Sequence, residues 1–139
     1  MRVNPILIRD ALKARGVSLG KPVDETYLKS FEREMNLSLD RFFRDVYTNF
    51  NGFASYDDRS QILLWPLERV LEAKYTSHRV GQSTFHPMGD VLIDSDFLMC
   101  CLEKDETPVI LLYEKRELAA SLSIFFERLL SGDFDFYER

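Results

Sequence analysis

The chain has 139 residues, of which 45% are hydrophobic and 29% are charged, and its formal net charge at pH 7 is −5. This length suits one domain that can bury a sufficient core without disulfides or metals, and the composition excludes a disordered chain. The longest apolar runs, residues 97–102 and 109–113, are too short for a membrane-spanning helix, and the first residues lack a secretory pattern. We therefore expect a cytoplasmic protein that binds no membrane.

Two helices are expected before residue 37. Asn4 can cap the first and Pro5 fits its first position, while apolar residues at helical spacing extend it through residues 4–15. Asp24 is the expected cap of the second helix, which Asn36 ends.

The third helix carries the clearest periodic signal. Ser38 is its expected cap, and apolar residues recur at helical spacing from Leu39 to Phe50. The periodicity stops at Asn51-Gly52, and no alternating strand precedes that pair. It therefore predicts a helix stop rather than a hairpin turn.

Strands are expected in the second half of the chain. Residues 61–65 predict a short buried strand, Pro66 then starts a short helix, and residues 76–89 are predicted to be irregular. Three further strands are expected, and they are Val91–Ile93, Phe97–Leu102 and Val109–Tyr113. A closing helix is predicted over residues 118–130. This order indicates an α+β single domain with a mostly antiparallel sheet packed against several helices.

The negative charge is concentrated near the C-terminus. Residues 90–139 carry 5 basic and 12 acidic residues, a balance of −7, whereas residues 1–89 have a balance of +2. This distribution disfavours nucleic acid and anionic lipid and favours a basic protein partner. The alternative is an acidic surface that serves only solubility.

The order of several short segments resembles the SUKH superfamily of SMI/KNR-like domains. The segments are "YLKSFEREMNLSL", "FFRDVYTNFNGF", "ILLWPLERVLE", "GDVLIDSDFLMCCL" and "ASLSIFFERLL". The resemblance covers about residues 24–131. It divides the chain into an N-terminal helix and linker, residues 1–23, and a SUKH-like domain, residues 24–139.

The resemblance implies a non-catalytic protein-binding function. Many bacterial members of this superfamily are immunity proteins that bind and neutralise a cognate polymorphic toxin, often a nuclease. Other members are regulatory or scaffold domains, which is the alternative for this chain. A small hydrolase is a weaker alternative, with Asp94 and Asp96 as its only candidate site.

The residues themselves indicate no catalytic, cofactor or metal site. His78 and His86 lack neighbouring ligands at zinc-binding spacing. Cys100 and Cys101 lie in a predicted strand, without the base and electropositive setting that a nucleophile needs. No phosphate-binding or nucleophile-elbow pattern is present.

The expected partner-binding surface is an acidic face with aromatic anchors. The residues proposed for it are Asp57, Asp58, Asp94, Asp96, Asp133 and Asp135, together with Tyr56 and Tyr137. The aspartates are expected to be solvated, and Trp65 is expected to belong to the core. The tail aromatics Phe134, Phe136 and Tyr137 either pack back on the domain or join an interface.

Overall fold

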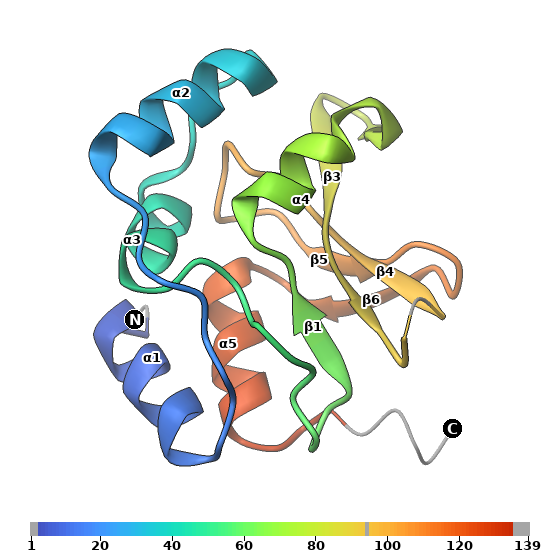
Figure 1. Ribbon diagram of the computed structural model, residues 1–139. Helices are drawn as coiled ribbons and strands as arrows, with labels where there is room; N and C mark the ends of the chain where they lie inside the picture. The colour runs from blue at the N-terminus through green and yellow to red at the C-terminus, as the bar shows by residue number, and fades with distance from the viewer. Residues whose placement is uncertain (1–2, 94, 135–139) are drawn as a thin grey trace.

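The computed structural model describes residues 3–93 and 95–134. Within these residues the chain forms a single α+β domain, with five α-helices and a curled antiparallel sheet of six strands that resembles half a barrel (Figure 1). The predicted fold class is therefore confirmed.

Helices occupy both ends of the chain and one position between the strands. They are α1 (Pro5–Ala14), α2 (Glu25–Met35), α3 (Arg41–Asn49), α4 (Leu67–Glu72) and α5 (Leu122–Leu130), and a 3-10 turn, η1 (Lys74–Thr76), follows α4.

The sheet has the order β1-β3-β4-β5-β6, and all its pairs are antiparallel. Its strands are β1 (Ile62–Leu64), β2 (His78–Val80), β3 (Ser83–Val91), β4 (Asp96–Cys100), β5 (Val109–Leu111) and β6 (Arg116–Ala119). The central strand β3 pairs with β2 at its start and with β1 and β4 towards its end.

The main core lies between the sheet and helices α1, α3 and α5. Figure 1 shows these helices grouped on one side of the sheet. Their apolar stripes meet the inward-facing strand residues, and the fully buried members include Ile8, Leu12, Tyr47, Phe125, Phe126, Leu98 and Leu111. Thus α1 contributes to the same core as the rest of the domain.

The short helix α4 lies elsewhere, against β3 and beside α2. Proline at the start of this helix fits the fixed φ of an N-terminal position. We call the sheet surface on this side, away from α1, α3 and α5, the outer face.

Several predicted helix boundaries are confirmed. The side chains of Asn4 and Asp24 accept hydrogen bonds from the first turns of α1 and α2, and Asn36 ends α2 in the left-handed conformation. The helix stop near Asn51-Gly52 is also confirmed, because α3 ends at Asn49 and Gly52 has a φ of +70°.

The predicted cap of α3 was wrong. Asp40 caps this helix by accepting a 2.9 Å hydrogen bond from the backbone N–H of Phe42. Ser38 lies two residues further from the helix, and the two residues that follow it make other contacts. Glu32 accepts the N–H of Leu39, and the N–H of Asp40 donates to the carbonyl of Leu102.

The prediction that residues 76–89 are irregular was also wrong. They form the β2–β3 hairpin, which turns at Gly81, and β3 is the longest strand of the sheet. Pro87 and a register shift next to Met88 interrupt the alternation that normally identifies a strand. The bulge therefore removed the alternating pattern from which the hairpin could have been predicted.

Two other boundaries differ from the predictions. Val91 ends β3, and Leu92 and Ile93 adopt left-handed φ values of 50° and 54°, so residues 91–93 are not a separate strand. Leu118 and Ala119, the first residues of the predicted closing helix, belong to β6 instead, and α5 begins only after its cap, Ser121. Apolar spacing in the sequence did not separate these two elements.

Among the helices of residues 3–93 and 95–134, none has the length and apolar character needed to cross a bilayer. Phe134 is buried, which confirms that this tail aromatic packs back on the domain. Phe136 and Tyr137 lie outside the described residues.

Replacing Gly52 tests the junction after α3. A Cβ at this position would lie 2.5 Å from the carbonyl carbon of Trp65, and the positive φ adds strain. We expect Gly52→Ala to lower the free energy of unfolding by at least about 3 kcal/mol, measured by urea denaturation.

Gly81 provides the matched control because its φ is +62° but nothing lies within 4 Å of its Cβ position. We expect Gly81→Ala to cost only the conformational strain, about 1 kcal/mol. Equal losses for the two variants would show that close packing at Gly52 is unimportant.

Candidate functional site

The outer face of the sheet contains an apolar hollow of about 360 Å³, which we call the outer groove. Pro87, Met99 and Leu112 form its floor, and Ala73 and Thr76 form a wall where α4 passes into η1. A volume of this size lies within the usual range for binding pockets.

Strand alternation explains why apolar side chains gather there. Pro87 pairs with Met99, and Met99 pairs with Ile110, so these residues share one face of β3, β4 and β5. The intervening residue Leu98 points to the helix-covered core. Both faces of these strands are therefore apolar, although only one is fully covered by helices.

Three aromatic rings line the groove in a row. The centroids of Trp65 and Phe97 are 5.9 Å apart, and those of Phe97 and Tyr113 are 5.7 Å apart, both in edge-to-face geometry. Exposure increases along the row, from 4% at Trp65 to 66% at Tyr113. The groove thus runs from a buried indole to a solvent-exposed phenol.

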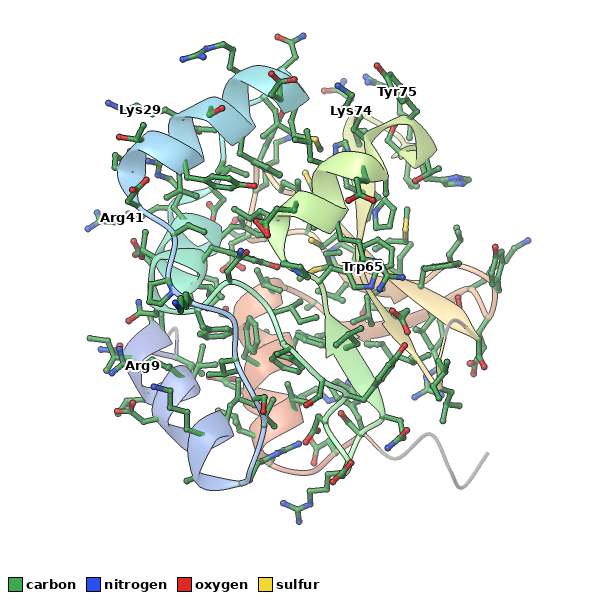
Figure 2. The ribbon with its side chains drawn as sticks, viewed as in Figure 1. Arg9, Lys29, Arg41, Trp65, Lys74 and Tyr75 are labelled. Carbon is green, nitrogen blue, oxygen red and sulfur yellow. The ribbon has the colours of Figure 1, made fainter. Side chains whose placement is uncertain are left out.

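Trp65 is held from three directions. Its indole Nε1 donates to Asp90 at 2.7 Å, its carbonyl accepts from Tyr47 at 2.7 Å, and its backbone N–H donates to Met88 at 2.8 Å. Figure 2 shows Trp65 near the centre of the molecule, beneath α4. These bonds fix the deep end of the groove.

A polar cluster surrounds the fully buried carboxylate of Asp90. Besides the indole N–H, this carboxylate accepts a hydrogen bond from the hydroxyl of Tyr56, and Arg69 lies 3.8 Å away. The Arg69 guanidinium also lies 4.1 Å above the Trp65 ring, in cation–π contact. The buried charge is therefore both paired and hydrogen-bonded.

The predicted acidic face does not form as expected, because two of its aspartates are interior residues. Asp57 is only 2% exposed and Asp96 only 4% exposed, so the expectation of solvated carboxylates was wrong for both. Asp58 and Asp133 are exposed, and Asp133 lies 3.6 Å from Arg128. Asp94, Asp135 and Tyr137 lie outside the described residues.

Asp57 forms a structural ion pair. It binds Arg15 of the segment after α1 and accepts hydrogen bonds from the backbone and hydroxyl of Ser60. Burial opposes its ionisation, but the bonds from Arg15 and Ser60 outweigh burial and lower its pKa below 3.8. Its charge therefore holds α1 to the loop before β1.

Asp96 positions the exposed end of the groove. Its carboxylate accepts the backbone N–H groups of Phe97, Tyr113 and Glu114 at 2.8, 2.7 and 2.9 Å. It thus fixes the turn between β5 and β6 that carries Tyr113. Tyr56 likewise supports the groove through Asp90, and its hydroxyl is committed to that bond.

The histidines and cysteines are placed apart from the groove's aromatic row. His78 is exposed on β2, while His86 is buried and its Nδ1 has no hydrogen-bond partner among the described residues. Burial lowers the pKa of His86, although the charge of Glu103 opposes this. Burial, with Cys101 and Asp105 nearby, raises the pKa of the Cys100 thiol.

The described residues include no group of three or more His, Cys, Asp or Glu side chains arranged to hold a metal ion. An acidic hollow of about 390 Å³ does lie beside the β4–β5 connection, bordered by Asp40, Glu103 and Glu106.

Sequence reasoning missed the outer groove. The signal was present in "DFLMC" and "VILLY", where apolar residues occupy both alternating sets of positions. Such strands need cover on both faces. Within residues 3–93 and 95–134, α4 and η1 cover part of the second face, and the groove is the part that they leave open.

Replacing Asp57 and Asp58 separately by asparagine tests whether the first is a buried ion-pair residue and the second an exposed charge. Asp57→Asn leaves the largely buried Arg15 without its carboxylate, so we expect a loss of about 3 kcal/mol in the free energy of unfolding. Asp58→Asn changes the same charge at an exposed site and should stay within about 0.5 kcal/mol of the parent. Urea denaturation at pH 7 measures both.

The same pair predicts a pH dependence. Because the pKa of Asp57 is lower in the folded state, its stabilisation is complete above the unfolded value of 3.8 and is lost as pH falls through the folded value. The difference in stability between the parent and Asp57→Asn should therefore shrink below that pH. A constant difference down to complete acid unfolding would contradict the assigned ion pair.

A scan against protein-family models finds no model that matches this chain, and a search of curated proteins finds no match either.

Proposed function

We propose that this protein is a cytoplasmic, non-catalytic protein-binding domain of the immunity type, which neutralises a toxin domain by direct binding. The observation that carries this proposal is the outer groove. Phe97 and Leu112 are half-buried there and Tyr113 is mostly exposed, beside a hollow of about 360 Å³. Aromatic side chains around an apolar pocket are typical of protein interfaces.

The environment of the reactive side chains favours binding over catalysis. Asp57, Asp90 and Asp96 each hold backbone or side-chain donors together, as structural carboxylates do. The raised pKa of Cys100 keeps its buried sulfur as a thiol, which is a poor nucleophile. The hydrolase alternative loses support because Asp96 is occupied by three N–H groups.

The net charge of −5 supports a basic partner such as a nuclease domain. Nuclease sites are cationic because they bind phosphates, and an acidic protein can steer towards them and block them. The exposed acids available for this role are Asp58 and Asp133, together with Glu103 and Glu106 beside the acidic hollow. Glu103 and Glu106 take the place of Asp57 and Asp96 in the acidic face that was predicted from the sequence.

A regulatory or scaffold domain that binds several host proteins is the second candidate. It would use the same outer groove, so the surface alone does not separate the two functions. The identity of the neighbouring gene separates the two functions, because immunity proteins are encoded beside the toxin that they neutralise.

Co-expression with the product of the neighbouring gene tests the immunity function. We expect that product to stop growth of a host cell when it is expressed alone, and this chain to restore growth. A toxin of unrelated sequence is the control and should remain lethal. Viable counts measure the outcome. A harmless neighbour, or a toxic one that this chain does not neutralise, would overturn the immunity assignment in favour of the regulatory one.

A further inference from the structure

We propose that Asn51 is a site of spontaneous deamidation that becomes reactive only when α4 moves away from it. The closed domain protects the side-chain amide, and an opened domain allows its conversion to aspartate or isoaspartate. Either product then prevents α4 from returning to its place. This inference concerns the chemical lifetime of the folded domain and does not depend on the proposed binding function.

The sequence supplies the reactive pair. Asn51 is followed by Gly52, whereas the other three asparagines of the chain are followed by Pro5, Leu37 and Phe50. Deamidation begins when the backbone nitrogen of the next residue attacks the side-chain carbonyl carbon, and glycine has no side chain to obstruct that approach. Asn51 is therefore the asparagine of this chain whose local sequence most favours the reaction.

The reaction needs only water. The backbone nitrogen of Gly52 forms a bond to Cγ of Asn51, its proton passes to water, and the side-chain nitrogen takes up a proton and leaves as ammonia. Water then opens the resulting cyclic imide at either of its carbonyl groups. Opening at one carbonyl gives aspartate. Opening at the other gives isoaspartate, in which the main chain passes through the former side chain and is longer by one carbon.

In the closed domain, three hydrogen bonds hold the amide group that must react. Oδ1 of Asn51 accepts the backbone N–H of Leu67 at 2.8 Å, and Nδ2 donates to the two carboxylate oxygens of Glu68 at 2.9 and 3.2 Å. Both partners belong to the first turn of α4. Closure of the imide ring moves Cγ onto the Gly52 nitrogen and expels Nδ2, so these bonds oppose the reaction while α4 is in place.

The backbone of the reactive pair is also held, from two sides. The N–H of Asn51 donates to the carbonyl of Gly20 at 3.2 Å, and the carbonyl of Gly52 accepts the N–H of Gly20 at 2.9 Å. On the other side, a Cβ added to Gly52 would lie 2.5 Å from the carbonyl carbon of Trp65. Ring closure sets a new torsion angle between Asn51 and Gly52, which these contacts resist. Reaction therefore requires local opening of the fold.

Neither product fits the closed arrangement. An aspartate at this position keeps an acceptor for the N–H of Leu67, but its second oxygen faces the carboxylate of Glu68, where an N–H donor now lies. Two carboxylates at hydrogen-bond distance disfavour each other's charge. Isoaspartate lengthens the main chain between its contacts with Gly20 and Trp65, where the backbones already approach closely. We therefore expect each product to displace α4.

Displacement of α4 affects two neighbouring parts of the domain. Glu68 also accepts the hydroxyl of Tyr27 at 3.0 Å, so α2, which lies beside α4 in Figure 1, loses a contact. The end of α4 leads into Ala73, which forms part of the wall of the outer groove. A molecule that has opened and reacted therefore differs permanently from one that has stayed closed.

The rate of deamidation in two variants of α4 tests the protection. Glu68→Ala frees Nδ2 and leaves the reactive pair unchanged, whereas Glu72→Ala removes the same charge from an exposed position on the same helix. Each protein is incubated at mildly alkaline pH, both folded and in urea. Trypsin then releases residues 45–59 as one peptide that contains both Asn49 and Asn51, so fragmentation in a mass spectrometer measures the two sites in the same molecule.

We expect Asn51 to deamidate at least about tenfold faster in urea than in the folded parent, because only opened molecules react. Folded Glu68→Ala should react at least about threefold faster than folded Glu72→Ala. Asn49 is the internal reference and should stay slower than Asn51 in urea. The proposal is wrong if Asn51 reacts equally fast in the folded parent and in urea, if it does not react in urea, or if the two variants have equal rates.

Asn51→Asp reproduces one product and tests its effect on the fold. Its midpoint of urea denaturation should fall, because two carboxylates then meet at the start of α4. Asn4→Asp makes the same change at the cap of α1, where either side chain can accept the N–H of Ile6, and should leave the midpoint unchanged or raise it.

A compensating variant separates charge repulsion from a general loss of packing. Adding Glu68→Gln to Asn51→Asp places an N–H donor opposite the new carboxylate and should recover most of the lost midpoint. An unchanged midpoint in Asn51→Asp, or no recovery in the double variant, would overturn the proposal.

Discussion

The side chain of Asn51 is the contact on which the arrangement of this domain depends. Its Oδ1 accepts the first N–H of α4, from Leu67, and its Nδ2 donates to Glu68, which also accepts the hydroxyl of Tyr27 from α2. The cap of α4 is Pro66, which has no side-chain hydrogen bond to offer, so Asn51 satisfies the helix from outside. The neighbouring Gly52 lets this segment approach the backbone of Trp65 closely. One Asn-Gly pair, two residues after the end of α3, therefore brings the chain against the backbone of Trp65 and caps the start of α4.

Trp65 extends this connection to both sides of the sheet. Its carbonyl accepts from Tyr47 in the helix-covered core, while its indole lines the outer groove and donates to Asp90. Because both groups belong to one residue, packing of α3 and the shape of the groove are mechanically linked. A groove built on core contacts of this kind is more rigid than one built on loops alone. The proposed binding surface is thus supported by the same contacts that hold the fold together.

The aspartates show how burial separates residues that are alike in sequence. Asp57 and Asp58 are adjacent, yet one forms a buried pair with Arg15 and the other faces solvent. Asp96 was selected as a surface charge and instead binds three backbone N–H groups beside Tyr113. The role of Asp57 depends on Arg15, which lies 42 positions away in the chain. The role of Asp96 depends on the β5–β6 turn, which begins 17 positions away at Tyr113. No local pattern of residues contains that information.

The sequence by itself determined the helical first half, the caps Asn4 and Asp24, the stop at Asn51-Gly52 and the α+β class, because these depend on periodicity and on local backbone chemistry. It also placed Trp65 in the core. Tertiary structure alone decided that residues 76–89 form a bulged hairpin, that residues 116–119 pair as β6 before α5 begins, and that Asp57 and Asp96 are interior. It also decided that Phe97, Leu112 and Tyr113 meet in a groove. The hairpin and β6 depend on strand pairing, and the burial of Asp57 and Asp96 depends on partners 42 and 17 positions away in the chain. The free energy of such contacts exists only once the chain has folded.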